Sequence, residues 1–238
     1  MRQDPGFNVN MVLDGFGVTI LHFACEWSDD SSPVIPLLLA HPDIDVNVKN
    51  KYGWTPFFYA CGGSPSCARE MLKDSRMKVN EPGDDGCTPL WYVAAYDGDI
   101  DTIKWWIASG REVDLGKPGD VGKTDAIGVA KEWGKKEVVT LLERFKIDAA
   151  QTRHAVRVEL GLLDELAAEM FAVVVFVSDG LLQIKDSTPT PAARFFNIAA
   201  QLPLELQMVL CFRLAGSAKE IILGKESEVA FKELARSL

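Results

Sequence analysis

The chain has 238 residues, of which 47% are hydrophobic and 25% charged, a composition typical of a folded protein and not of a disordered one. Its formal net charge is −9, so nucleic acid is not an expected partner, because an acidic surface gains nothing from releasing phosphate counterions. The strongest apolar run, FAVVVFV at 171–177, is far shorter than the ~20 apolar residues that cross a bilayer, so no membrane span is predicted.

Cysteine and histidine usage gives little sign of a metal centre. The three histidines are widely scattered, and Cys61 and Cys67, spaced C-x5-C, are a weak zinc signal because no matching pair follows them. The first ten residues, MRQDPGFNVN, lack the apolar core of a secretory signal. We therefore expect no metal and no cofactor, reduced and buried cysteines, and a cytoplasmic location with the nucleus as the alternative. The cysteines are Cys25, Cys61, Cys67, Cys87 and Cys211.

Four Gly-x-Thr triplets divide the first 148 residues into units. They begin at Gly17, Gly53, Gly86 and Gly122, at separations of 36, 33 and 36 residues. The segments that follow them are ILHFAC, PFFYAC, PLWYVAA and DAIGVA, and a second apolar segment completes each unit. One such helix pair cannot bury its apolar face alone, so stacked units are predicted to share a continuous core. Small residues allow neighbouring helices to approach closely at Ala24, Ala60, Ala94 and Ala130.

The order of residues within a unit resembles that of an ankyrin repeat: Asp-x-x-Gly-x-Thr-Pro-Leu-His, a short helix, Leu-Leu, and a closing Asp-Val-Asn. In the first unit the matching residues are Asp14, Gly17, Thr19, Leu21 and His22, with Leu38 to Asn47 at its end. In the third they are Thr88, Pro89, Leu90, Gly98, Trp105 and Trp106. The resemblance covers about residues 5–148 and implies an α-solenoid with short β-hairpin turns.

Two domains are therefore predicted. Residues 1–148 form the repeat domain, in which DPGFNVN is the end of a partial N-terminal repeat and four units follow. Residues 149–238 form an α-helical bundle, since apolar positions recur there at three- and four-residue spacing. The run VVVFVSDGLLQIK within 171–185 also fits a β-hairpin, but a buried helix ending near Asp179 and Gly180 is favoured, because a lone hairpin is marginally stable. Residues expected to start later helices are Thr190 with Pro191, Pro203 and Ser227.

The loop GKPGDVGKT at 116–124 resembles a phosphate-binding P-loop but departs from its spacing. Lys117 stands where the first glycine of that motif belongs, and the preceding SGREVDL is the end of a repeat, not a buried strand. Gly122 and Thr124 are instead in register with the other three triplets. A nucleotide-binding enzyme is thus disfavoured, and no Ser/His/Asp set suggests another catalytic class, because the resemblance gives His22 a structural role.

The ankyrin resemblance implies a protein-binding scaffold that grips its partner with the hairpin tips and the first helices. The positions in register with this surface are Phe16, Val18, Glu26, Trp27, Lys51, Tyr52, Trp54, Asp85, Tyr96, Asp97, Val121, Lys123, Glu132 and Trp133. Aromatic rings dominate interface hot spots, although about half of the six in this set are expected to belong to the core. Trp105 and Trp106 occupy the Leu-Leu positions and are expected to be structural. The predicted function is a monomeric, non-catalytic adaptor for a protein partner.

A second functional hypothesis comes from LPLELQMVLCFRL at 202–214, which resembles the opening of an F-box. Its matching residues are Leu202, Pro203, Glu205, Leu206, Val209 and Leu210. The resemblance implies a substrate receptor of a cullin-type ubiquitin ligase. A proline-started amphipathic helix in a bundle accounts for the same residues.

Overall fold

The computed structural model describes residues 8–27, 34–96, 99–116, 124–183, 190–216 and 224–237. These ranges hold thirteen α-helices and no strand, and their one isolated β-bridge joins Val12 to Thr19. The chain forms two compact bodies, Met1–Val156 and Arg157–Leu238. The mainly-α fold class is confirmed, while the domain boundary predicted at 148/149 stays a prediction.

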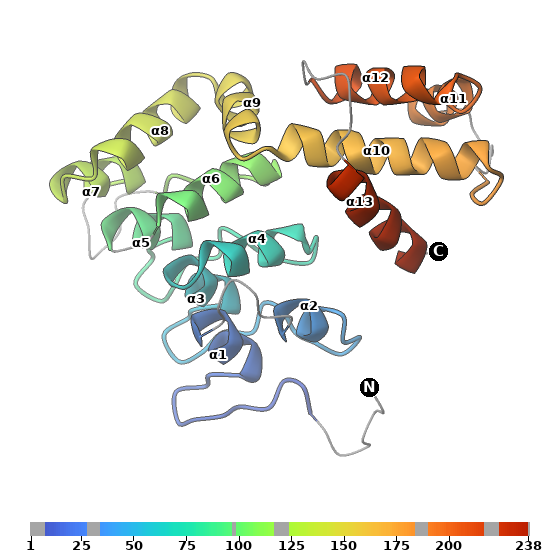
Figure 1. Cartoon of the computed structure of the whole chain (residues 1–238). Helices are drawn as coiled ribbons and strands as arrows, with labels where there is room; N and C mark the ends of the chain where they lie inside the picture. Colours follow the sequence, from blue (N-terminus) through green and yellow to red (C-terminus); the bar gives the residue numbers. More distant parts are fainter. Residues whose placement is uncertain are drawn as a thin grey trace. The chain divides into compact units, whose positions relative to one another are not determined.

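The N-terminal body is a stack of helix pairs (Figure 1). The pairs are α1 (Ile20–Trp27) with α2 (Val34–Leu39), α3 (Pro56–Gly62) with α4 (Pro65–Lys73), α5 (Pro89–Ala95) with α6 (Ile100–Ser109), and α7 (Ala126–Glu132) with α8 (Lys136–Ile147). The first helices pack in the order α1, α3, α5, α7, and the second helices pack in the order α2, α4, α6, α8. Each pair thus covers the apolar face of the next, as the repeat pattern predicted.

In the third and fourth repeats the first helix begins where a side chain accepts a hydrogen bond from a free backbone N–H group. In the third repeat the Thr88 hydroxyl accepts a hydrogen bond from the Trp91 N–H at 3.3 Å, with proline at the first helical position. The fourth repeat has no proline there, and α7 begins one residue later in register. Asp125 caps α7 instead of Thr124, accepting from the Gly128 N–H at 2.8 Å.

The core between repeats is close-packed around small residues and one indole. Ala60, Ala94 and Ala130 are fully buried, which lets successive first helices approach closely. Trp106 is also fully buried, meets Phe57 edge to face at 4.9 Å, and is structural as predicted. Trp105 is half-buried, with the Arg69 guanidinium 4.3 Å from its ring centre.

A ladder of asparagines joins the ends of successive repeats. Asn10 donates from Nδ2 to the Asp43 carbonyl at 2.7 Å, and its Oδ1 accepts from the Asp45 N–H at 2.8 Å. Asn47 and Asn80 make the same pair of bonds to the next repeat, at 2.9 and 2.8 Å and at 3.3 and 3.2 Å. Asn10 therefore makes the same pair of bonds as Asn47 and Asn80, while the partial N-terminal repeat ending at DPGFNVN stays a prediction.

Helix α9 (Ala149–Glu159) crosses the boundary between the bodies, and its first residues complete the N-terminal one. Arg153 donates a hydrogen bond from Nε to the carbonyl of Ile107 at 3.0 Å, and Ile107 is the third residue from the end of α6. Thr152 and Val156 are buried on the same helix. The first part of α9 is therefore tied by this bond to the third repeat.

The C-terminal body is built on its longest helix, α10 (Leu162–Ser178). Helices α11 (Pro191–Ala199), α12 (Leu204–Ala215) and α13 (Gly224–Ser237) all pack against α10. The core between them includes Ala168, Phe171, Val174, Cys211 and Phe212. None of the described helices is long and apolar enough to cross a membrane.

The favoured helix at 171–178 is confirmed against the hairpin alternative. Helix α10 runs to Ser178, Asp179 follows as its C-cap, and Gly180 takes the left-handed conformation at φ +72°. Residues 184 and 185, the end of that alternative, lie outside the described residues. Two predicted helix starts are confirmed: Thr190 caps α11, and Pro203 directly precedes α12. The prediction that Ser227 starts the last helix was wrong, because α13 already begins at Gly224 and this serine lies inside its first turn.

Removing the buried indole tests the packing of the stack. We expect Trp106→Ala to lower the free energy of unfolding by about 3–5 kcal/mol, through lost burial and the cavity left behind. The matched control is Trp133→Ala, which removes an exposed indole and should change stability by about 0.5 kcal/mol or less. Urea denaturation followed by circular dichroism measures both. Equal effects of the two substitutions would contradict this packing.

Candidate functional site

Polar side chains shape the hairpin tips so that the residues between them project outward. Asp14 Oδ1 accepts hydrogen bonds from the Phe16 N–H at 2.9 Å and the Val18 N–H at 3.0 Å. Asn50 closes the second tip with the same two bonds, at 2.9 and 3.0 Å. Gly17 completes its tip at φ +84°, a conformation that favours glycine. The first three Gly-x-Thr triplets thus mark tight turns, as predicted, and the fourth lies partly outside the described residues.

Backbone hydrogen bonds then join one tip to the next. The Lys51 N–H donates to the Phe16 carbonyl at 2.8 Å, and the Asp84 N–H donates to the Tyr52 carbonyl at 3.0 Å. These bonds fix the distance between residues at equivalent places in neighbouring tips. Side chains that are a whole repeat apart in sequence therefore become lateral neighbours.

A continuous row of aromatic rings follows this arrangement across the tips and first helices. We call it the aromatic row, and its members are Phe16, Tyr52, Trp54, Phe58, Tyr92, Tyr96 and Trp133. Successive ring centroids lie 6.0, 5.7, 5.4, 5.0, 5.4 and 6.1 Å apart. These separations are those of favourable aromatic pairs. Five of the predicted binding residues are therefore brought together in one surface feature.

The expectation that half of the predicted rings belong to the core was wrong. Phe16, Tyr52, Tyr96 and Trp133 are 55%, 50%, 50% and 62% exposed. Trp54 is half-buried, and none of the six predicted rings is fully buried. Five of the six rings, Trp27 among them, thus keep half or more of their surface in water, whereas Trp54 is partly covered by its stacking on Phe58.

The remaining predicted residues lie in several environments. Trp27 is exposed and contacts Phe23, with ring centroids 6.3 Å apart, instead of joining the aromatic row. Asp85 is half-buried and engaged within the fold, accepting from the Tyr92 hydroxyl at 2.5 Å. Glu26, Lys51 and Glu132 are exposed, and Val18 is half-buried. Asp97, Val121 and Lys123 lie outside the described residues.

Three rings at this surface escaped the sequence reasoning: Phe58, Tyr59 and Tyr92. A signal for two of them is present in the repeat register, because an aromatic residue stands four positions after the triplet threonine in each of the first three repeats. These residues are Phe23, Tyr59 and Tyr92. Their equivalence predicts a column of rings along the first helices, next to the tips.

Gly83 makes room for the central indole. In the third tip it occupies the position that Asp14 and Asn50 hold in the first two tips. A Cβ atom at Gly83 would lie 2.8 Å from Trp54 Cδ1 and 2.9 Å from Trp54 Nε1. The missing side chain thus lets the indole lie over the third tip, where it stacks on Phe58 with an interplanar angle of 3°.

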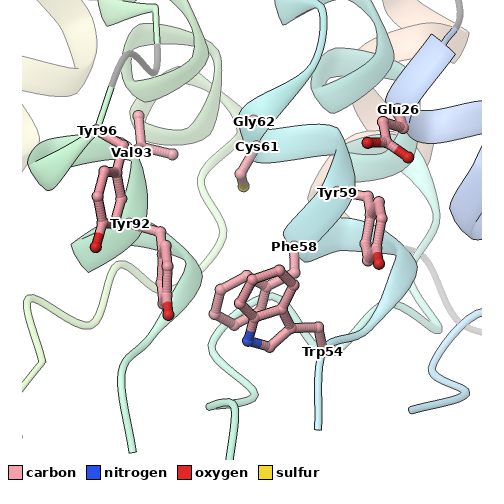
Figure 2. A pocket seen from close by; sticks show the side chains of 9 residues that line it. All are labelled: Glu26, Trp54, Phe58, Tyr59, Cys61, Gly62, Tyr92, Val93 and Tyr96. Atoms are coloured by element: carbon pink, nitrogen blue, oxygen red, sulfur yellow. The ribbon is translucent and has the colours of Figure 1, made fainter. Parts of the chain in front are cut away.

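Part of the aromatic row lines an open pocket with a volume of about 270 Å³, formed by residues of α1, α3 and α5 together with Trp54 (Figure 2). The rings that line it are Trp54, Phe58, Tyr59, Tyr92 and Tyr96. Glu26 contributes a carboxylate from α1, and Cys61 also lines the pocket. Burial raises the pKa of both Tyr59 and Tyr92, and the bond to Asp85 raises that of Tyr92 further, so both phenols stay neutral at physiological pH.

His22 supports this surface from within. The Thr19 N–H donates to His22 Nδ1 at 3.2 Å, so the proton of the neutral ring is on Nε2 and is donated to the Trp54 carbonyl at 3.0 Å. His22 is fully buried, and its burial lowers its pKa. The histidine therefore has the structural role expected of it, and it fixes the backbone of the central aromatic residue.

The described residues offer little for metal or thiol chemistry. No group of three or more histidine, cysteine, aspartate or glutamate side chains among them could hold a metal ion. All five cysteines are buried free thiols, in agreement with the sequence. Burial raises the pKa of Cys25, Cys61 and Cys211, so these side chains remain thiols at neutral pH.

The P-loop-like segment and the F-box-like segment lie in different parts of the chain. Residues 110–116, which precede the P-loop-like segment, form no strand, and 117–123 lie outside the described residues. Among the F-box-like residues, Pro203, Glu205 and Leu206 are exposed at the start of α12. The side chains of Leu202, Val209 and Leu210 are half-buried.

Comparison with known proteins agrees with this geometry. Residues 3–82 match the family model for ankyrin repeats in three copies. Ankyrin repeats are thus shown over residues 3–82. It is similar to human SMC5-SMC6 complex localization factor protein 1, with 29% identity over 181 residues, which are 72% of this chain and 17% of the human protein. It is also similar to mouse Rabankyrin-5, with 28% identity over 134 residues, which are 56% of this chain and 11% of that protein. The chain thus spans less than a fifth of either relative.

The buried histidine of the first ankyrin repeat makes stability depend on pH. Below the ordinary histidine pKa of 6.5 the unfolded chain takes up a proton that folded His22 resists, so the free energy of unfolding falls as the pH drops from 6.5 towards the lowered pKa of the folded state. The His22→Asn variant should be less stable at pH 7.5 but should lose less stability between pH 7.5 and 5. Denaturant titrations across this range measure the difference. Because His41 and His154 are common to both proteins, identical pH profiles would contradict the prediction.

Proposed function

We propose that this chain is a non-catalytic adaptor that binds a partner protein through the hairpin tips and first helices of its ankyrin repeats. The observation that carries the proposal is the aromatic row, in which six partly exposed rings from four repeats are joined through the buried ring of Phe58. Monomeric soluble proteins rarely expose a contiguous apolar patch without a use for it. Tyrosine and tryptophan also contribute most of the binding energy in many interfaces.

The row is held rigidly before any partner arrives, which favours tight binding. The tips are joined by backbone hydrogen bonds, the Trp54 carbonyl is held by His22, and the Tyr92 hydroxyl is held by Asp85. A partner that covers these rings immobilises little that is not already ordered, so less conformational entropy is lost. The human relative is named as a localization factor of a protein complex, and an adaptor role is consistent with that name. We propose that the chain acts as a monomer, in the cytoplasm or the nucleus.

Partner capture tests the aromatic row directly. The immobilised full chain and its Tyr52→Ala/Trp133→Ala variant are compared in affinity purification from cells that express the protein, followed by quantitative mass spectrometry. Both rings are exposed members of the row, so we expect the fold to persist and specific captures to fall about tenfold or more. Losses of this size are typical when hot-spot side chains are truncated.

The matched control is Leu37→Ala/Ile147→Ala, which removes two exposed apolar side chains outside the row. Circular dichroism verifies that both variants remain folded. If the two double variants retain the same captured proteins as the wild type, the aromatic row is not the binding surface and the proposal fails.

The F-box-like residues define a second candidate function, recruitment of a cullin-type ubiquitin ligase. The observation in its favour is the start of α12, where Pro203, Glu205 and Leu206 are exposed together with Leu204. If this function is correct, the full chain co-purifies with the adaptor subunit of the ligase, and Leu204→Ala/Leu206→Ala removes the interaction. Absence of binding at micromolar adaptor concentration rejects it.

A further inference from the structure

We propose that the pocket in the aromatic row receives the cationic side chain of a lysine or arginine from a basic segment of the partner. This inference rests on the proposed function and names the chemistry of the partner. The aromatic rings would contact the charged end of the side chain, and the Glu26 carboxylate would pair with it.

The walls of the pocket present aromatic rings at several orientations. Trp54 and Phe58 are parallel at 5.4 Å, and Tyr92 meets them edge to face at 5.3 and 5.0 Å. Tyr59 and Tyr96 extend the two walls (Figure 2). A cation within about 6 Å of a ring centroid is attracted by the negative face of the ring, and several rings around one site strengthen the attraction.

The charge of the lining has one sign. Among the residues that line the pocket, Glu26 carries the charge, and the lining includes no lysine or arginine. The carboxylates of Asp14 and Glu26 are close enough to act electrostatically on Tyr59, and the carboxylate of Asp85 acts on Tyr92. An entering cation thus meets a negative potential, whereas an anion or a carboxylate side chain would be repelled.

The size of the pocket suits one side chain. Its volume of about 270 Å³ lies below the range of roughly 300–1,000 Å³ that is usual for drug-sized ligands and cofactors. Exposed rings continue on both sides, with Tyr52 towards the first tip and Trp133 towards the fourth repeat. A peptide could therefore insert one basic side chain while its neighbouring residues cover the adjacent rings.

Selection from random peptides tests this specificity without knowledge of the natural partner. Displayed twelve-residue peptides are selected on the full chain, and the enriched sequences are synthesised for measurement of Kd by calorimetry. We expect each enriched peptide to contain a basic residue whose replacement by glutamine or norleucine weakens binding about tenfold or more. Norleucine keeps the aliphatic stem of lysine but removes its charge. Exchanges among lysine, arginine and trimethyl-lysine show which cation the pocket prefers.

Two protein variants locate the bound cation. Glu26→Gln should weaken binding of the enriched peptides about fivefold, and Tyr96→Leu should weaken it about three- to tenfold, as expected for loss of an ionic partner and of one ring. The matched control is Glu137→Gln, which removes an exposed carboxylate of the second helix α8 that does not line the pocket and should change Kd less than twofold.

The outcomes separate this inference from the function on which it rests. Some enriched peptides could lose affinity with Tyr52→Ala/Trp133→Ala and yet need no basic residue, or bind the Glu26→Gln and Tyr96→Leu variants as tightly as the wild type. Either result overturns the inference and leaves the adaptor function in place. Peptides whose binding is unaffected by any of these substitutions count against both. A selection that enriches no peptide also overturns the inference, while the capture experiment still decides the adaptor function.

Discussion

A pair of helices as short as α3 and α4 buries too little apolar surface to be stable by itself, so each repeat must lie against its neighbours. The buried alanines let the first helices come close, and the asparagine ladder and tip-to-tip hydrogen bonds fix their register. Everything at the proposed binding surface depends on this stacking. The aromatic row has no counterpart within a single repeat, because its rings become neighbours only when three junctions between repeats have formed.

The centre of the surface shows how structural and exposed residues are coupled. His22 of the first repeat holds the backbone of Trp54 in the second, and Gly83 at the third tip accepts the indole of that residue. Three repeats thus position one side chain. Because the imidazole must be neutral to accept from Thr19 and donate to Trp54, the geometry of the surface and the stability of the stack respond to the same proton.

The C-terminal body follows a different principle, with one long helix serving as the support for three shorter ones. Its core alternates alanines with large rings, such as Ala168 near Phe171 and Ala215 near Phe212 on the same helices. This pattern allows helices to pack closely without a repeating register. The apolar residues exposed at the start of α12 make this body a candidate for a second interaction, distinct from that of the repeats.

Periodicity and local chemistry were readable from the sequence because they depend on residues close together in the chain. The Gly-x-Thr spacing, the cap at Thr190, the end of α10 at Gly180 and the structural position of His22 all follow from short-range rules. The exposure of the six rings could not be predicted from short-range rules, since a ring placed by register can face either the core or the solvent. The neighbouring repeat decides which. Nor did the sequence disclose that a glycine at position 83 frees space for an indole 29 residues earlier. Sequence determined the repeats and the residue types at their tips, whereas the pocket with Glu26 on its wall was decided by tertiary stacking, because only that brings three repeats within contact distance.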